Sequence, residues 1–400
     1  MKRDIFGDIV RVEDKDGFLD FIKDIKDHRL DRKKLYSVAE IIFLAFCGCL
    51  SNCNSWEDIE LFGKGKLEFL RRFFAYENGI PSDDTLRRFF RVLDPVVFET
   101  RFEEWVRYIL RTDVAGKVIA IDGKTSRGSH DDEIKAMHVV SAFVAEDKLT
   151  LANRTVDCKS NEIKAIPKLL EVIDIKNAIV TIDAMGTQHK IANQIITNGG
   201  NYIFALKGNQ KSLENDVQEI FKNTSQINKK YVSTYESCDK SHGRFEVRNC
   251  TVITDNKWLN WLKDSRKDWS SIKSVIKITS TRTIKGKESI EDRFYISGLD
   301  NSNAEQSLNY IRSHWAIENN LHWTLDMSFG DDKSRIRKGN APQNMLVIKK
   351  IALNLLEIIK ARYPRIDGVR TSIVRLRKLT GWLDEWLLKV LCAEHEIINS

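Results

Sequence analysis

Two aspartates each follow an apolar segment that has the composition of a buried β-strand. Asp122 comes just past Val118–Ile121, and Asp183 comes just past Ile179–Ile182. In an open α/β sheet, ligands bind at the carboxyl ends of the strands. If the two strands are parallel neighbours, their carboxylates lie roughly 5 Å apart, the spacing between strands. Carboxylates at that distance repel each other unless a cation lies between them. The alternative is that each aspartate only forms a turn.

A third acid, Glu318, lies in a segment that has the pattern of one long helix, residues 303–325. On a regular helix its face is otherwise mostly apolar and aromatic, with two histidines. The members of that face are Ile311, His314, Trp315, His322 and Leu325. A carboxylate on a face suited to burial needs a partner. Mg²⁺ held together with the two aspartates would be one, because Mg²⁺ prefers oxygen ligands. A salt bridge to Arg312 or to a lysine is the alternative.

Other titratable groups near Glu318 leave alternatives open. His322 follows it by one helical turn and could tune the site or carry a proton, or it could be a hydrogen-bonded core histidine. Asp326, Asp331 and Asp332 are rival acids. They follow the helix, so we expect them to lie away from the site.

The elements that position these acids predict an α/β protein with a mixed sheet. The first three strands have no helix between them and predict an antiparallel meander, and the later strands alternate with helices and must join in parallel. The expected strands are 117–121, 138–144, 149–156, 178–182 and 202–206, with helices over 162–173, 188–197 and 212–222. Residues 228–300 are rich in strand and turn signals and predict a β-rich insertion containing Trp258, Trp261 and Trp269.

A helical region precedes this sheet. Ser37 with Glu40 has the capping-box pattern before an apolar run, and Ser82 predicts the start of a second helix over 83–93. We therefore predict two domains, a helical one over 1–112 and an α/β one over 113–400. The second domain ends in a helical, basic tail over about 341–400, beginning with an amphipathic helix over 341–361.

Composition excludes several classes of protein. The chain has 400 residues, 42% of them hydrophobic and 30% charged, which is not the composition of a collagen-like, mucin-like or wholly disordered protein. The longest apolar run, Ile41–Leu50, is much shorter than the ~20 residues of a membrane span. The first residues lack the apolar region of a signal peptide, so we expect a cytoplasmic protein. The net charge of +7 is concentrated in residues 331–400, with 14 basic and 8 acidic residues, and permits a polyanionic partner.

The seven cysteines do not form a zinc motif. Cys47, Cys49 and Cys53 cluster, but no second couple accompanies them, so we interpret them as reduced core residues. The Gly-x-Ser-x-Gly pattern of a serine nucleophile and the glycine-rich phosphate-binding loop are both absent from the sequence.

Several short strings, together with the order of elements, resemble one family. The chain is similar to the H-repeat-associated transposases, a group of bacterial insertion-sequence DDE transposases, over nearly its whole length. The N-terminal helical region resembles their transposase-associated domain. The strings that carry the resemblance are Asn78–Thr85, Ile121–Lys124, Asp183–Gln188, Leu206–Gln210, His242–Arg248 and His314–Asp326.

The resemblance implies a fold, a reaction and partners. It implies a ribonuclease-H-like fold whose catalytic, metal-binding triad is Asp122, Asp183 and Glu318. The implied reaction is cleavage of DNA at the ends of an element, followed by joining to target DNA. The implied cofactor is two Mg²⁺ per site, with Mn²⁺ as a substitute. The implied partners are double-stranded DNA and further copies of the chain. Tyr310 and Arg312 match the Tyr-Arg-Glu arrangement of related transposases only loosely in spacing.

Basic residues near these strings are candidates for DNA contacts. They are Lys124, Lys207, Arg244, Arg248, Arg312, Arg335 and Arg337. His242, Arg244, Glu246 and Arg248 share one strand face, which could be a DNA-facing stripe or a cross-strand ladder of salt bridges. Two other functions stay open: a nuclease on the same fold that cuts without joining, and a catalytically silent DNA-binding relic. A relic should have lost an acid, and all three are present.

Overall fold

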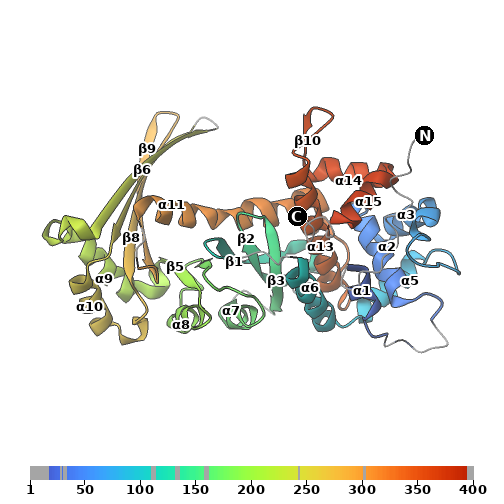
Figure 1. The fold of residues 1–400 in the computed structure, drawn as a ribbon, viewed down its shortest axis with the longest axis horizontal. Coiled ribbons are helices and arrows are strands. Elements are labelled where there is room, and N and C mark those ends of the chain that lie inside the picture. The colour runs from blue at the N-terminus through green and yellow to red at the C-terminus, as the bar shows by residue number, and fades with distance from the viewer. Residues whose placement is uncertain are drawn as a thin grey trace.

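The computed structural model describes residues 18–27, 29, 34–109, 114–130, 136–156, 162–241, 244–300 and 303–393. The molecule is elongated, with a group of helices at one end and a large sheet, flanked by further helices, along the rest (Figure 1). The predicted α/β class with a mixed sheet is confirmed.

The sheet has nine strands in the order β3-β2-β1-β4-β5-β9-β8-β7-β6. Strands β1, β2 and β3 are antiparallel, whereas β4 and β5 join β1 in parallel, as the alternation of elements predicts. Strand β9 pairs antiparallel with β5, so the β-rich segment extends the same sheet. The strands are β1 Val118–Ser126, β2 Met137–Val144, β3 Leu149–Val156, β4 Ile179–Ile182, β5 Asn201–Leu206, β6 Val232–Ser241, β7 Arg244–Ile253, β8 Ser274–Ile284 and β9 Lys287–Ser297.

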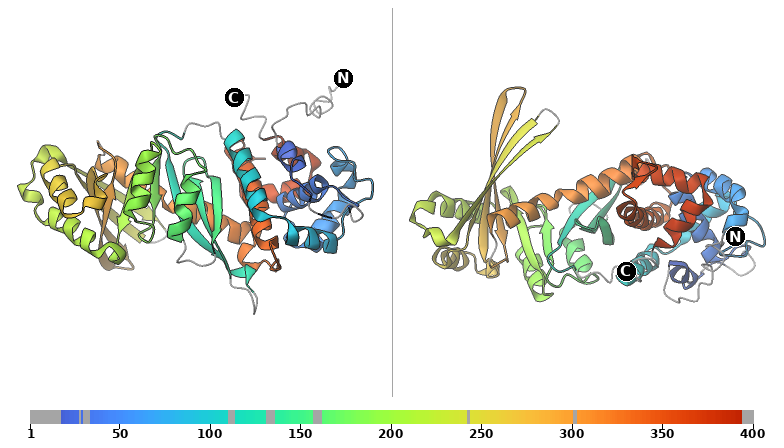
Figure 2. Two further views of the ribbon diagram at one scale, coloured as in Figure 1. Left: turned by 90° about the horizontal axis from the view of Figure 1, so that it is seen from below. Right: turned by 45° about the horizontal axis from the view of Figure 1, so that its top comes forward.

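Helices cover both faces of the sheet. Helices α7 (Glu162–Leu170) and α8 (His189–Thr197) lie on one face, and α11 (Ala304–Ser313) runs across the other (Figures 1 and 2). Helices α9 (Lys211–Lys222) and α10 (Asn256–Ser265) lie at the end of the sheet far from the helical part (Figure 1). The face crossed by α11 is the one that carries the site described below.

The N-terminal helices begin where their caps predict. Ser37 and Glu40 form the predicted capping box, and the Ser82 hydroxyl accepts a hydrogen bond from the Thr85 amide. Nearly every residue of helix α2 (Val38–Leu50) is buried, which is why its sequence shows no polar face. The helices are α1 Phe18–Lys23, α2 Val38–Leu50, α3 Trp56–Gly65, α4 Leu67–Leu70, α5 Asp83–Val92 and α6 Pro95–Ile109.

The C-terminal helices pack against these N-terminal ones. Helix α13 (Ala341–Arg362) contacts α2, α5, α6 and strand β3, and α14 (Ile373–Trp382) contacts α2. Helix α15 (Asp384–Leu391) packs on α13 and α14, and a two-stranded hairpin, β10 (Arg365–Ile366) with β11 (Val369–Arg370), precedes them. The helix predicted over 341–361 is present, but the prediction that one of its faces is polar and exposed is wrong. Helix α13 is enclosed and buries even Lys349 and Lys350. One hydrophobic core therefore joins the two ends of the described chain.

The prediction of one regular helix over 303–325 is also wrong. Helix α11 ends at Ser313, a π-helical turn spans Ile317–His322, and α12 continues over Trp323–Phe329. A π-turn widens the helix locally and is typical of functional sites. Trp315, predicted on a buried face, is 52% exposed because that face borders an open cavity.

Of the three clustered cysteines, two are core residues and Cys53 is half-buried. Cys47 and Cys49 are buried free thiols, and burial raises the pKa of the Cys53 thiol to about 12. Among the described residues, no helix combines the length and the apolar character needed to cross a bilayer.

Candidate active site

The two aspartates lie next to each other at one edge of the sheet. Ile121 on β1 pairs directly with Ile182 on β4 in a parallel register, and each aspartate is the next residue along its strand. The prediction that β1 ends before Asp122 is wrong: the strand continues to Ser126. It continues because β2 runs beside it beyond the end of β4 and pairs Asp122 with Ser141. Asp122 thus has a rigid backbone, whereas Asp183 begins a loop.

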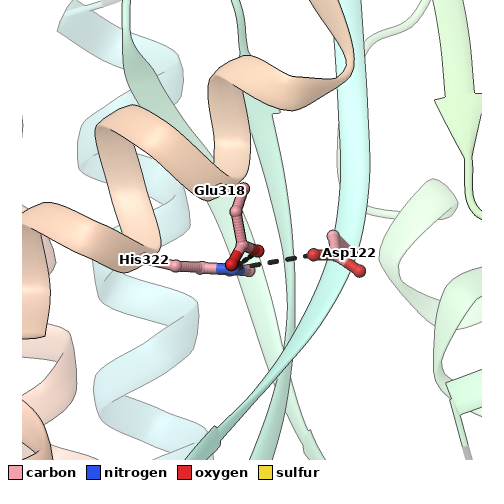
Figure 3. A group of neighbouring side chains, drawn as sticks. All are labelled: Asp122, Glu318 and His322. Carbon is pink, nitrogen blue, oxygen red and sulfur yellow. Dashed lines mark hydrogen bonds and ion pairs between the residues drawn. The ribbon is translucent and has the colours of Figure 1, made fainter. Parts of the chain in front are cut away.

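The π-turn brings Glu318 and His322 to Asp122. His322 Nδ1 lies 3.3 Å from Glu318 Oε2 and 3.6 Å from Asp122 Oδ2 (Figure 3). The side chain of His322 is 6% exposed, that of Asp122 is 23% exposed and that of Glu318 is 58% exposed. The structure therefore places Glu318 and His322 beside Asp122.

Asp183 lies beside this group without joining it. The ligand atoms of Asp122, Glu318 and His322 all lie within 4.8 Å of one another, and Asp183 is outside that set. Its Oδ1 instead accepts a hydrogen bond of 3.0 Å from the Gly186 amide. Asp122, Asp183 and Glu318 nevertheless line the same open cavity of about 1040 Å³, so all three carboxylates can face one ligand.

The electrostatics of the site favour a cation. Burial raises the pKa of Asp122 to about 6, and the negative charges of Asp183 and Glu318 add to this rise, while His322 opposes it. The hydrogen bond from His322 lowers the pKa of Glu318. Burial lowers the pKa of His314, whose Nδ1 lies 3.0 Å from the Thr181 hydroxyl.

These residues fit a divalent cation. Three carboxylates converge on a cavity, and the pKa of Asp122 is raised partly by the charges of the other two. The Nε2 atom of His322 is buried and has no hydrogen-bond partner within the described part of the chain. Carboxylate oxygens are the ligands that Mg²⁺ and Mn²⁺ prefer, and a bound cation would remove the repulsion between them.

Two of the strings quoted above form a contact that sequence reasoning missed. Asn209 Nδ2 donates a hydrogen bond to the carbonyl oxygen of Ala184, and Gln210 Nε2 donates one of 3.0 Å to that of Thr187. The Thr187 hydroxyl donates in turn to the carbonyl oxygen of Ala205. The segment after β5 therefore fixes the loop that begins at Asp183. The presence of two amide side chains just after a strand end was the available signal.

A second feature missed from the sequence lies behind Asp122, on the opposite face of β1. His138 Nε2 lies 2.6 Å from Glu162 Oε1, and both side chains are buried. A Cβ atom on Gly123 would lie 2.6 Å from each of these two atoms. Position 123 therefore requires glycine so that β1 can pass over the pair.

The rival acids already have cationic partners. Asp326, Asp331 and Asp332 lie close together, but Lys349 Nζ lies 2.7 Å from Asp331. Lys124 Nζ lies 2.7 Å from Asp326 and 3.4 Å from Asp332, and its side chain is only 13% exposed. The structure thus places Lys124 in an internal ion pair rather than on a surface open to DNA.

Most of the predicted DNA-contacting arginines are also paired. Arg248 Nη2 lies 2.7 Å from Glu246 on the same strand, and Arg244 Nη2 lies 3.4 Å from it. Arg282 on β8 lies 2.9 Å from the same carboxylate, so this face carries salt bridges within and across strands. Arg312 lies 2.8 Å from Asp239, which excludes it as the partner of Glu318 in this structure.

The remaining candidates for DNA contact differ in whether their side chains already have a partner within the protein. Arg337 Nε donates a hydrogen bond of 3.0 Å to the carbonyl oxygen of Gly128. Lys207 and Arg335 are exposed and have no ion pair within the described ranges, and Lys207 lines the cavity. His242 lies outside the described residues.

Comparisons with known proteins show the family of this chain. The family described as "Transposase DDE domain" matches residues 115–355, and the family described as "DDE_Tnp_1-associated" matches residues 19–106. The chain therefore belongs to the DDE transposase family, and to its H-repeat-associated group.

Two relatives cover most of the chain. YncI of Escherichia coli O157:H7, whose name marks it as a transposase, is 40% identical over 387 residues, which are 95% of this chain and 96% of that protein. The H repeat-associated transposase YhhI of Escherichia coli K12 is 39% identical over 344 residues, which are 84% of this chain and 89% of that protein. Among solved structures, a piggyBac transposase synaptic complex with hairpin DNA gives a TM-score of 0.41 at 10% identity, covering 95% of this chain and 78% of that chain.

Proposed function

We propose that this chain is a transposase that cleaves DNA at the ends of an insertion element and joins those ends to target DNA. The observation that supports this most is the convergence of Asp122, Asp183 and Glu318 on one open cavity from a strand, a strand end and a π-turn. The order and directions of β1 to β5 support a ribonuclease-H-like assignment for this part of the sheet.

In this proposal the three carboxylates hold divalent metal ions, two Mg²⁺ or, as a substitute, Mn²⁺. When bound, such ions activate an attacking hydroxyl and stabilise the leaving oxygen of a phosphodiester. His322 keeps Glu318 ionised and turned toward Asp122 through their 3.3 Å contact. The Asn209 contact holds the loop after Asp183, so that its carboxylate stays at the cavity.

The proposed substrate is double-stranded DNA. Lys207 supports this, because it is an exposed, unpaired cation within the described chain at the lining of the same cavity as the acids. A cation at that position would contact a phosphate next to the one being cleaved. Assembly of several copies on DNA, and action in the cytoplasm, are parts of the proposal that rest on the family relationship.

The experiment uses a labelled duplex carrying the two ends of the flanking element, incubated with the purified chain and either Mg²⁺ or EDTA. We expect nicking at the ends with Mg²⁺ only, and joined products when target DNA is added. Asp183→Ala should bind the duplex and fail to nick it. Cutting without joining would indicate the nuclease, and binding without cutting under every metal tried would indicate the relic. Cutting that survives Asp183→Ala would exclude the proposed triad.

A further inference from the structure

We propose that the projecting ends of strands β6 to β9 form an arm that contacts a DNA duplex away from the cavity. The inference rests on the proposed function and assigns part of the DNA surface to residues outside the site. The arm tip is defined here by six exposed residues of the two hairpins: Lys240, Arg244, Phe245, Ile284, Lys285 and Lys287.

The two hairpins end side by side and stand away from the body. Ser241 pairs with Arg244 at the end of one hairpin, and Ile284 pairs with Lys287 at the end of the other. Arg244 also pairs with Ile284, which joins the two ends. Figure 2 shows these strands extending beyond the helices and the rest of the sheet. Strands this long are not needed to cover the core, since the residues that define the arm tip are exposed.

The positive charge of this arm is concentrated at its tip. Lys240, Lys285 and Lys287 are exposed and have no ion pair within the described residues. Nearer the body two further cations are paired: Lys277 lies 2.8 Å from Asp292, and Arg282 lies 2.9 Å from Glu246. Glu246 itself is 1% exposed, so its charge is not presented to a partner. Glu288, next to Lys287, is also exposed, so a partner that reaches the tip meets three unpaired lysines against one carboxylate.

The turn between β8 and β9 places a lysine at the extreme end. Lys285 has φ 48° and Gly286 has φ 76°, which are the positive values of a two-residue hairpin turn. Asparagine or glycine adopts such a φ more easily than lysine does, so the cation is held there against a backbone preference.

The chemistry of the tip fits nucleic acid better than a protein. Phe245 and Ile284 are 44% and 49% exposed beside the unpaired lysines. A β-ribbon fits the major groove of DNA, where apolar side chains reach base edges while lysines reach the phosphates on either side. A second copy of this chain would bring the same positive charges to the contact, which would oppose an arm-to-arm association.

The test compares two triple variants in duplex binding. Lys240→Gln, Lys285→Gln and Lys287→Gln are combined in the arm variant. The control variant combines Lys229→Gln, Lys257→Gln and Lys267→Gln, three exposed lysines at the opposite ends of the same strands. Binding of a fluorescent element-end duplex is measured by anisotropy in EDTA over a salt series. Unchanged urea midpoints show that both variants are folded.

We expect the arm variant to bind at least tenfold more weakly at about 0.1 M salt, with the slope of log affinity against log salt reduced by about 2–3, because each phosphate contact contributes ~0.9. The control variant should stay within about twofold of the wild type and keep its slope. An arm variant with wild-type affinity and slope would overturn the proposal. A double variant with Phe245→Ala and Ile284→Ala gives a second test. If it changed the sedimentation of the protein but not its DNA affinity, the tip would be a contact between copies, and the proposal would be overturned. If the wild type bound no duplex at all, the proposed function itself would fail.

Discussion

The Nζ atom of Lys124 lies 2.7 Å from Oδ1 of Asp326, and this contact ties the strand of Asp122 to the helix that follows Glu318. Lys124 is two residues after Asp122, and Asp326 is two helical turns after Glu318. The distance between the two proposed metal ligands therefore depends on an ion pair that belongs to neither of them.

Replacing Lys124 tests whether this ion pair stabilises the fold. Lys124→Met leaves Asp326 and Asp332 without their cation and should lower the free energy of unfolding by about 1–3 kcal/mol, measured by urea denaturation. Lys117→Met is the control, because Lys117 is 25% exposed against 13% for Lys124 and pairs with Asp147 alone, so its loss should cost less than about 1 kcal/mol. Equal losses of stability in the two variants would mean that the ion pairs of Lys124 stabilise the fold no more than the pair of Lys117 does.

Lys207 and Lys124 should differ in their effect on DNA binding. Lys207 is exposed at the cavity, so Lys207→Gln should weaken duplex binding and reduce the salt slope by about 1. Lys124→Gln should leave the slope unchanged, because its charge is already used inside the protein. Anisotropy titrations over a salt series make the comparison. The reverse ranking would show that Lys124 leaves its ion pair to meet DNA.

Gly123 should not tolerate a side chain. The added methyl group of Gly123→Ala would lie 2.6 Å from atoms of both His138 and Glu162, so it must separate the pair or push β1 away. We expect a loss of about 1–3 kcal/mol in the free energy of unfolding. Gly65→Ala is the matched control, since a methyl group there meets no atom within 4 Å. A Gly123→Ala protein as stable as the wild type would contradict the observed packing.

Lys350 should make stability depend on pH. Burial lowers the pKa of this lysine to about 7, and its Nζ donates a 2.9 Å hydrogen bond to Ser141. Between pH 7 and the unfolded pKa of 10.5, the unfolded chain binds more protons at this position, so stability rises with pH.

The variant Lys350→Met has no amine to titrate at this position. Its free energy of unfolding should exceed that of the wild type at pH 7.5, and this excess should shrink by about 2 kcal/mol by pH 9.5. Urea midpoints of both proteins at several pH values measure the difference. A constant difference across that range would mean that Lys350 is charged in the folded protein.

Sequence reasoning predicted the parts of the fold that follow from local pattern. The capping box at Ser37 and the apolar strands before Asp122 and Asp183 depend on adjacent residues, and the structure has them. The parallel pairing of β1 with β4 followed from the helices between the later strands. The approach of Glu318 to Asp122 was one of two alternatives that helix periodicity left open, and the family resemblance favoured it.

The parts that were missed depend on contacts between distant segments. No local sequence pattern indicates that Lys124 forms an ion pair with Asp326, or that pairing with β2 extends β1 beyond Asp122. The π-turn at Ile317–His322 interrupts a sequence that reads as regular helix. The burial of α13 is set by N-terminal helices more than two hundred residues away, so its own pattern could not reveal it.

The central claim is that Glu318 acts as a metal-binding carboxylate in DNA cleavage. The most direct test is the single-turnover rate of end cleavage in Mg²⁺ for Glu318→Gln, compared with Glu214→Gln, which removes another carboxylate from the lining of the same cavity. The account predicts that Glu318→Gln binds the duplex normally and cleaves it ~10²-fold or more slowly. It predicts that Glu214→Gln cleaves at close to the wild-type rate. Wild-type cleavage by Glu318→Gln, or equal losses in the two variants, would contradict it.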